Sequence, residues 1–273
     1  MKEEECVLDV RGLSVQVQSH QGWTPVVDDV SFQIKAGQVL GIVGESGCGK
    51  SMTSLAILGL LPAAARLSQG SIALKGQELT TMKPAQLRRI RGQELSLIMQ
   101  NPMTAFNPLV TIGTQFAETL FAHQNMTRKQ ASTHASTCLK QMNLHEPERI
   151  LKQFPFELSG GMLQRVMIAL SLSLNPSLLI ADEPTTALDS INRRNVVDAF
   201  RAIKKEAKTA ILLVSHDLNV IEKVADVVAV MKKGQLVEMA ATHDLLTSPQ
   251  NEYTQLLWNS RLTLGSRHEQ ESI

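Results

Sequence analysis

The sequence predicts an α/β fold, and three observations support this fold class. Val39–Val43 and Leu178–Ala181 are short, wholly apolar runs, as expected for parallel strands buried on both faces. Strand-like and helix-like segments alternate around these runs, which is the pattern of a parallel sheet covered by helices. Between about residues 101 and 155 the pattern becomes helical, so a helical subdomain is expected as an insertion.

The first part of the chain is expected to be rich in β-structure. Short apolar strands alternate with turns from Cys6 to about Ile98, and Ser71–Leu79 has the pattern of a hairpin. The other expected elements are helices over Met52–Leu60, Thr111–His123, Thr127–Asn143, Ser159 to about Leu174 and Ser190–Ala207, a strand over Thr209–Val214, and a hairpin over Val227–Met239 that turns at Lys233-Gly234. We expect one domain over residues 6–250, with the inserted helical subdomain at about 101–170, and a short tail over 251–273.

Composition excludes several classes of protein. The 273 residues are 43% hydrophobic, enough for a sizeable core, and the net charge of +1 gives no electrostatic footprint for nucleic acid. Cys6, Cys48 and Cys138 are odd in number and widely spaced, so they predict neither a disulfide framework nor a zinc site. The acidic start MKEEEC does not resemble a signal peptide, and no run of about 18 apolar residues predicts a membrane span.

A glycine-rich loop follows the first apolar run and has the pattern G-x-x-x-x-G-K-[ST]. Its residues are Gly44, Glu45, Ser46, Gly47, Cys48, Gly49, Lys50 and Ser51. Such a loop and the following helix, from Met52, present backbone N–H groups to phosphate. Lys50 is expected to reach the β- and γ-phosphates of ATP, and the Ser51 hydroxyl to bind Mg²⁺. The alternative is a glycine-rich turn before a core helix.

Two adjacent carboxylates end the second apolar run. Asp182 and Glu183 follow Leu178–Ala181, at the carboxyl end of a strand, where open α/β sheets bind ligands. Asp182 is expected to hold Mg²⁺ through water, and Glu183 to orient and polarise the attacking water. A solvated turn is the alternative, and the phosphate loop in the same chain makes it less favoured.

A third motif, LSGGMLQR at Leu158–Arg165, lies between these two. Ser159, Gly160 and Gly161 open a helix, so their N–H groups and the hydroxyl can approach an anion. This motif resembles the signature of ATP-binding cassette (ABC) proteins, and the resemblance spans about residues 7–246. It implies a P-loop NTPase (RecA-like) core with an N-terminal antiparallel β subdomain and an inserted α-helical subdomain. It also implies that Ser159, Gly160, Gly161 and Gln164 serve the ATP of a facing cassette; capping of the helix alone is the alternative.

The resemblance assigns roles to further polar residues. Gln100 matches the loop glutamine that touches Mg²⁺ and senses the membrane partner, and Asp189 matches the loop that crosses the dimer interface. His216 follows the apolar strand Ile211–Val214 and matches the histidine that contacts the γ-phosphate. Taken singly, Gln100 and His216 are more often ordinary polar residues at strand ends.

Two positions depart from the family pattern. The family stacks adenine on an aromatic residue upstream of the phosphate loop, but that position falls near Val17, which cannot stack. Trp23 is the nearest aromatic residue and is the candidate, with an ordinary core or surface tryptophan as the alternative. Cys48 stands where serine is commoner, and a thiol facing anion-binding N–H groups predicts a lowered pKa and alkylation that ATP prevents.

The resemblance further implies the motor subunit of a membrane transporter. The expected complex has a second ATPase subunit, two transmembrane permease subunits and an extracytoplasmic substrate-binding protein, with this chain peripheral on the cytoplasmic face of the membrane. A cassette ATPase that acts on chromosomes, DNA repair or ribosomes is the remote alternative. The cassette ATPases that act on chromosomes and repair carry long coiled coils between the loop glutamine and the signature. In this sequence those positions are Gln100 and Ser159, and no sustained heptads occur between them.

The finer phrasing resembles the importer group for peptides and nickel. The phrases MQNP at Met99–Pro102, AFNPL at Ala105–Leu109 and ADEPTTALD at Ala181–Asp189 carry this resemblance. Within the group, FPFELSGGMLQR is most similar to motors for nickel and metal–metallophore complexes. Leu163 stands where peptide motors more often have arginine, and no cysteine follows Cys138. Nickel or a metal chelate is therefore the favoured cargo, with di- or oligopeptides as the alternative.

Overall fold

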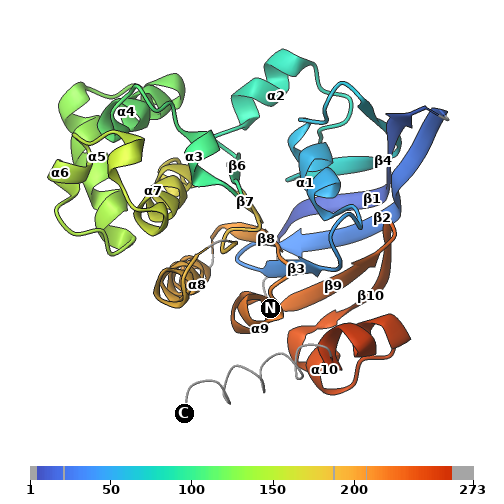
Figure 1. Ribbon diagram of the computed structural model, residues 1–273. Helices are drawn as coiled ribbons and strands as arrows, with labels where there is room; N and C mark the ends of the chain where they lie inside the picture. The colour runs from blue at the N-terminus through green and yellow to red at the C-terminus, as the bar shows by residue number, and fades with distance from the viewer. Residues whose placement is uncertain (1–4, 21, 187, 207, 260–273) are drawn as a thin grey trace, which may run out of the picture. The chain divides into compact units, whose positions relative to one another are not determined.

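The computed structural model describes residues 5–20, 22–186, 188–206 and 208–259 (Figure 1). The chain divides into two compact units, each treated by itself below. Unit 1 comprises residues 1–7, 35–38 and 81–212, and unit 2 comprises residues 8–34, 39–80 and 213–273.

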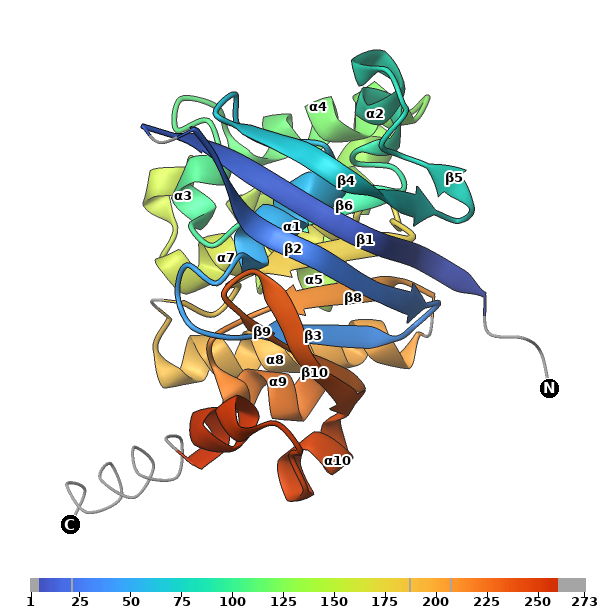
Figure 2. The same ribbon diagram turned by 90° about the vertical axis from the view of Figure 1, so that its right-hand side faces the viewer.

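An antiparallel sheet forms the first part of unit 2 (Figure 2). Its order is β2-β1-β4-β5, with β1 at Cys6–Ser19, β2 at Gly22–Lys35, β4 at Ala65–Leu74 and β5 at Gln77–Glu78. The register pairs Val10 with Ile72 across β1 and β4. Alternation along β2 buries Val30, Phe32 and Ile34, so one face of this sheet belongs to the core.

The second sheet of unit 2 carries the phosphate loop. Its strands are β3 (Val39–Val43), β9 (Val227–Lys232) and β10 (Gln235–Ala241), with β3 parallel to β9 and β9 antiparallel to β10. The helices are α1 (Lys50–Leu58), α9 (Leu218–Val224) and α10 (Thr242–Thr247). Gly41 lets α9 lie close on β3, because a Cβ at this position would stand 2.9 Å from the Ile221 side chain.

Unit 1 combines two parallel strands with a helical group. The strands β6 (Leu95–Ile98) and β7 (Leu178–Asp182) pair in parallel. The helices are α2 (Pro84–Ile90), α3 (Pro102–Ala105), α4 (Ile112–His123), α5 (Arg128–Gln141), α6 (Pro147–Ile150), α7 (Gly160–Leu172) and α8 (Ser190–Lys205), with the 3₁₀ turn η1 at Pro155–Glu157. Leu120 of α4 and Ala131 of α5 pack with Leu174 in the core of the helical group. Strand β8 (Ala210–Val214) is divided between the units, so the sheet order is β10-β9-β3-β8 in unit 2 and β8-β7-β6 in unit 1.

The expected helices, the strand before His216 and the second hairpin are confirmed to within a few residues at their ends. The first strands are longer than expected: β1 and β2 have 14 residues each, and β4 begins at Ala65, before the predicted start of the first hairpin at Ser71. Gly59 ends α1 in the left-handed conformation, and Thr127 caps α5 through its side chain, as glycine and threonine do at these positions. The hairpin β9–β10 turns at Lys233-Gly234, both at positive φ. The predicted end of one helix, Ala207, lies outside the described residues.

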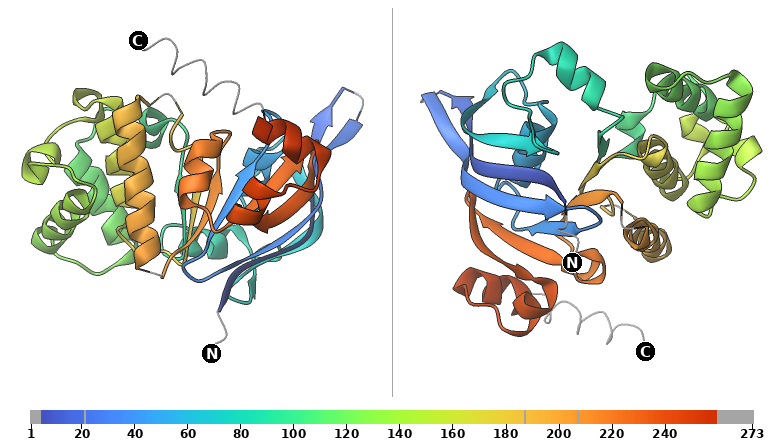
Figure 3. Two further views of the ribbon diagram at one scale, coloured as in Figure 1. Left: turned by 90° about the horizontal axis from the view of Figure 1, so that it is seen from below. Right: turned by 180° about the vertical axis from the view of Figure 1, so that it is seen from behind.

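The chain after residue 250 is helical over 252–259 in its described part (Figure 3). Tyr253 and Trp258 of this segment are buried. The domain limits 6–250, 101–170 and 251–273 stay a prediction. Among the described residues, no helix has both the length and the apolar character that crossing a membrane needs.

Candidate functional site

The phosphate loop of unit 2 connects β3 to α1, and the backbone of other segments packs closely against it. Gly44 and Gly49 have φ angles of 153° and 111°, which a residue with a Cβ rarely adopts. A Cβ at Gly44 would collide with the Met231 carbonyl oxygen, and one at Gly49 would stand 2.5 Å from the Val26 carbonyl oxygen. The two glycines therefore let the loop lie directly against neighbouring backbone.

Lys50 is turned back onto its own loop. Its Nζ donates to the carbonyl oxygens of Gly44 at 2.8 Å and Glu45 at 3.0 Å, and only 7% of the residue is exposed. The ammonium group thus donates to backbone oxygens of the loop itself. Ser51 is exposed at the start of α1, and Met52 is half-buried. The loop thus supplies a cation and an accessible hydroxyl at a helix N-terminus.

The expectation of an acidified Cys48 is wrong. Burial raises the pKa of the Cys48 thiol, and the nearby Lys50 ammonium only partly opposes this effect. The Sγ lies 3.9 Å from Lys50 Nζ, and 6% of the residue is exposed. Loss of water around the thiolate outweighs the attraction of one ammonium group, so the charged form of Cys48 is disfavoured.

Trp23 and His216 are the other candidates in unit 2. Trp23 lies on β2 and is 39% exposed, and the Arg66 guanidinium stands 4.1 Å from the centre of its ring. Arg66 also donates to Gln16 Oε1 at 2.9 Å, so one face of the indole is covered by a restrained side chain. His216 is exposed just beyond the end of β8. Both roles stay predictions.

Unit 1 holds the two carboxylates of the second motif. Asp182 is the last residue of β7 and Glu183 follows at φ 52°, a conformation that non-glycine residues seldom adopt. Glu183 Oε2 accepts a hydrogen bond from Thr186 Oγ1 at 3.1 Å. This bond fixes the direction of a half-buried carboxylate, as the proposed role in orienting water requires.

The signature motif opens α7 in the expected way. Ser159 Oγ accepts from the Met162 N–H at 3.3 Å, so the residue is the N-cap and still has a hydroxyl proton to donate. Gly160 is exposed, and a Cβ there would meet no atom within 4 Å. Gln164, by contrast, is 1% exposed, and its Nε2 has no hydrogen-bond partner among the described residues. Its proposed contact with a facing ATP stays a prediction.

Asp189 is the N-cap of α8 and accepts two hydrogen bonds from Asn192, a residue that the sequence motifs did not indicate. Asp189 Oδ1 accepts from the Asn192 N–H at 2.8 Å, and Oδ2 accepts from its Nδ2 at 2.7 Å. The backbone hydrogen bond from Asn192 is the largest cause that lowers the pKa of Asp189, followed by the side-chain bond. The Asn192 amide in turn fills the space beside Gly161. The exposed loop residue and the signature helix are thus connected within unit 1.

The predicted ligands for Mg²⁺ have suitable chemistry. Ser51, Asp182 and Gln100 offer hydroxyl, carboxylate and amide oxygens, which Mg²⁺ prefers. Gln100 is exposed and directly follows Met99 after β6. Ser51 belongs to unit 2, whereas Asp182 and Gln100 belong to unit 1. When bound, Mg²⁺ would neutralise charge that develops on the phosphate oxygens.

The strand–glycine loop–helix arrangement, with carboxylates at the end of a second strand, defines a P-loop nucleotide-binding protein. The family model for ABC transporters matches residues 27–186, more than half of the chain. The chain belongs to the ABC transporter family, and it is an ATPase that binds ATP with Mg²⁺.

ATP-binding proteins of transport systems are similar to this chain over most of its length. The dipeptide transport ATP-binding protein DppD of Bacillus subtilis is 41% identical, with 94% of this chain and 77% of the relative covered. The metal-staphylopine import system ATP-binding protein CntD of Staphylococcus aureus is 43% identical, with coverages of 88% and 89%. A dimeric ATP-binding cassette solved in a post-hydrolysis state with ADP and Pi has a TM-score of 0.77 at 25% identity, covering 86% of this chain and 98% of that one. This solved structure confirms the predicted fold class.

Proposed function

We propose that this chain is the ATP-hydrolysing motor of a membrane importer for nickel or a metal–metallophore complex. The observation that carries the importer role is the 41–43% identity, over about nine tenths of the chain, to ATP-binding subunits of dipeptide and metal-staphylopine import systems. The motif FPFELSGGMLQR supports the metal cargo. Leu163 of this motif is fully buried in α7, so it acts on the packing of the helix and not by touching a nucleotide. A peptide cargo remains the second candidate, because DppD is similar to the same extent.

The ATPase roles are assigned to residues of both units. Lys50 exchanges the Gly44 and Glu45 carbonyls for β- and γ-phosphate oxygens, and the loop N–H groups bind the same phosphates. The Glu183 carboxylate, directed by Thr186, orients the attacking water and polarises it. His216 contacts the γ-phosphate from its exposed position after β8.

A second cassette completes the ATP site in this proposal. Ser159, with its hydroxyl proton available, and the bare backbone at Gly160 donate to the γ-phosphate held by a facing subunit. Asp189 is exposed at the start of α8 and lies in the loop that meets that subunit. The facing subunit is a different ATPase chain or a second copy of this one.

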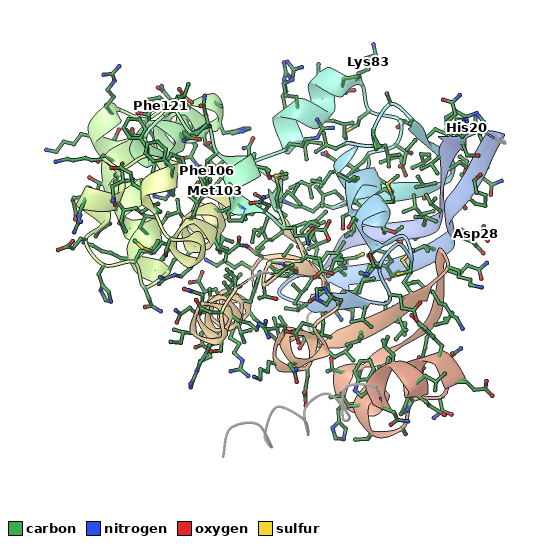
Figure 4. The ribbon with its side chains drawn as sticks, in the orientation of Figure 1. His20, Asp28, Lys83, Met103, Phe106 and Phe121 are labelled. Atoms are coloured by element: carbon green, nitrogen blue, oxygen red, sulfur yellow. The ribbon has the colours of Figure 1, made fainter. Side chains whose placement is uncertain are left out.

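Exposed apolar side chains of unit 1 are the proposed contacts for membrane subunits. Among the described residues, half of the exposed large apolar side chains fall within segment 99–156: Met99, Met103, Leu109, Phe121 and Phe156. Figure 4 labels Met103 on α3 and Phe121 on α4. Leu109 and Phe156 are 82% and 62% exposed, so both side chains are accessible to a partner. We assign contacts with two permease subunits to these side chains. In this proposal the chain is peripheral on the cytoplasmic face of the membrane, and an extracytoplasmic binding protein delivers the cargo.

Reconstitution tests both the motor and the cargo. The chain is purified with the permease and ATPase subunits encoded beside it and placed in lipid vesicles. ATP hydrolysis is then measured with metal-loaded and with peptide-loaded binding protein. Stimulation by the metal-loaded protein alone supports the proposal, and stimulation by peptide alone replaces the cargo. Hydrolysis unchanged by any membrane subunit overturns the importer role.

Leu109→Ser combined with Phe156→Ser is expected to abolish assembly with the permease subunits while leaving ATP binding unchanged.

A further inference from the structure

The C-terminal helical segment 252–259 touches the phosphate loop through one hydroxyl group. The Glu45 N–H donates to Tyr253 Oη at 3.3 Å. The two residues are 208 positions apart in the sequence. Tyr253 is buried, with 7% of the residue exposed. Both residues belong to unit 2. A distant part of the chain therefore contacts the loop that binds ATP.

This bond meets a peptide group that Lys50 already holds. The N–H of Glu45 and the carbonyl of Gly44 belong to the same planar peptide unit. The carbonyl accepts from Lys50 Nζ at 2.8 Å, while the N–H donates to Tyr253. The orientation of this peptide is thus fixed at both ends. Gly44 would otherwise allow it to rotate, because glycine lacks the Cβ that restricts the backbone.

The tyrosine is itself held in position from two sides. Lys232 Nζ lies 4.5 Å from the centre of its ring, within the range of a cation–π contact. The start of the helical segment is fixed to β10, because Glu238 accepts from the Gln250 N–H at 2.8 Å and the Asn251 N–H at 3.1 Å. These contacts favour one ring position for Tyr253, so its hydroxyl can act as a fixed support.

We propose that Tyr253 is a positioning residue for ATP binding, which orients the Gly44–Glu45 peptide and so holds the phosphate loop ready for phosphate. A rotated peptide would change the course of the backbone at the start of the phosphate loop, so the loop would have to reorder before it could hold phosphate. A loop that must reorder on binding has a lower affinity than one already ordered. The inference rests on the proposed phosphate role of Gly44–Ser51 and adds a residue that none of the motifs described above contains.

The test compares Tyr253→Phe with Leu256→Ala in the full chain. The first removes only the hydroxyl; the second removes an exposed side chain, 69% accessible, from the same helical segment. Tyr253→Phe is expected to weaken MgATP binding about threefold to tenfold, as loss of one hydrogen bond does, and to leave kcat at saturating ATP unchanged. Hydrogen exchange at segment 44–50 of the nucleotide-free protein is expected to become faster. Leu256→Ala is expected to change neither.

Unchanged affinity and exchange in Tyr253→Phe would overturn the inference, as would equal weakening by Leu256→Ala. A lower kcat with unchanged affinity would also overturn it, because the residue would then act on the chemical step. The exchange measurement contains no nucleotide, so it still judges the contact if the roles proposed for the loop fail. Absence of ATP binding by the unaltered protein, in turn, would count against the phosphate loop and not against Tyr253.

Discussion

The side-chain amide of Asn192 fills the space where a Cβ on Gly161 would stand. Asp189 holds this amide through Nδ2 at 2.7 Å, so the amide is not simply a flexible surface group. The lack of a Cβ at Gly161 therefore leaves room for the neighbouring helix, in addition to the proposed approach of its bare backbone to an anion. Gly160, one residue earlier, has open space around it. The two signature glycines are thus distinguishable by packing alone.

Gly161→Ala is expected to lower the free energy of unfolding by about 1–3 kcal/mol, as added atoms in a packed contact do. Gly160→Ala is the matched control and is expected to melt like the unaltered protein, apart from a small gain in helix propensity. Adding Asn192→Ala to Gly161→Ala removes the colliding amide and should restore most of the loss. Thermal melting of the four proteins measures this. Equal melting temperatures for the two single glycine variants would contradict the packing argument.

Glu183→Gln keeps the shape of the side chain and its bond from Thr186 but removes the basic carboxylate. A positioned base contributes about 10²–10⁴ in rate, so ATP hydrolysis should fall at least about a hundredfold while ATP still binds. Steady-state hydrolysis and equilibrium binding of ATP check the two halves of this statement. Turnover close to normal would remove Glu183 from the role of base.

Trp23→Ala is expected to weaken ATP binding if adenine stacks on the ring face that Arg66 leaves open. Loss of one base–aromatic stack costs about 1–3 kcal/mol, or about fivefold or more in affinity. Arg66→Gln is a useful comparison, because it removes the guanidinium at 4.1 Å without removing the ring. ATP affinity that is the same in Trp23→Ala and the unaltered protein would end the assignment.

The motifs predicted the loop, the carboxylates and the signature helix because each depends on local chemistry at fixed spacing. Gly44-to-Ser51 and Asp182-Glu183 could be recognised in this way. Asn192 and Tyr253 could not, because their importance comes from contacts with residues distant in the chain: 31 positions from Gly161 (192 − 161) and 208 positions from Glu45. The reversed pKa shift of Cys48 has a related cause. The attracting Lys50 and the N–H groups can be recognised from the motif, but the depth of burial depends on the folded surroundings.

Alkylation of the cysteines should follow burial. Cys6 is exposed, whereas Cys48 and Cys138 are buried and have raised pKa values. At pH 7 we expect iodoacetamide to modify Cys6 within minutes, and Cys48 much more slowly, both with and without ATP, because the thiolate is the reactive form. Mass spectrometry of digested protein gives the rate at each site. Rapid labelling of Cys48 that ATP prevents would restore the original expectation of an acidified thiol.

The buried thiol of Cys138 is expected to lower the free energy of unfolding in alkaline solution. Burial raises the pKa of this thiol from 9.0 to about 11, while His134 Nε2 lies 3.7 Å from Sγ and is occupied by the Ser173 carbonyl at 2.7 Å. The folded protein thus keeps this proton between pH 9 and 11, where the unfolded chain releases it. This contribution to stability is fully present below pH 9 and is lost as pH rises toward 11, amounting to about 2 kcal/mol.

Urea unfolding at pH 8 and pH 10.5 measures this loss of stability, with Cys138→Ala as the control. The control is less stable at pH 8 because of the lost packing, but its stability should fall less between the two pH values. An equal fall in both proteins would show that the thiol does not control this part of the pH dependence.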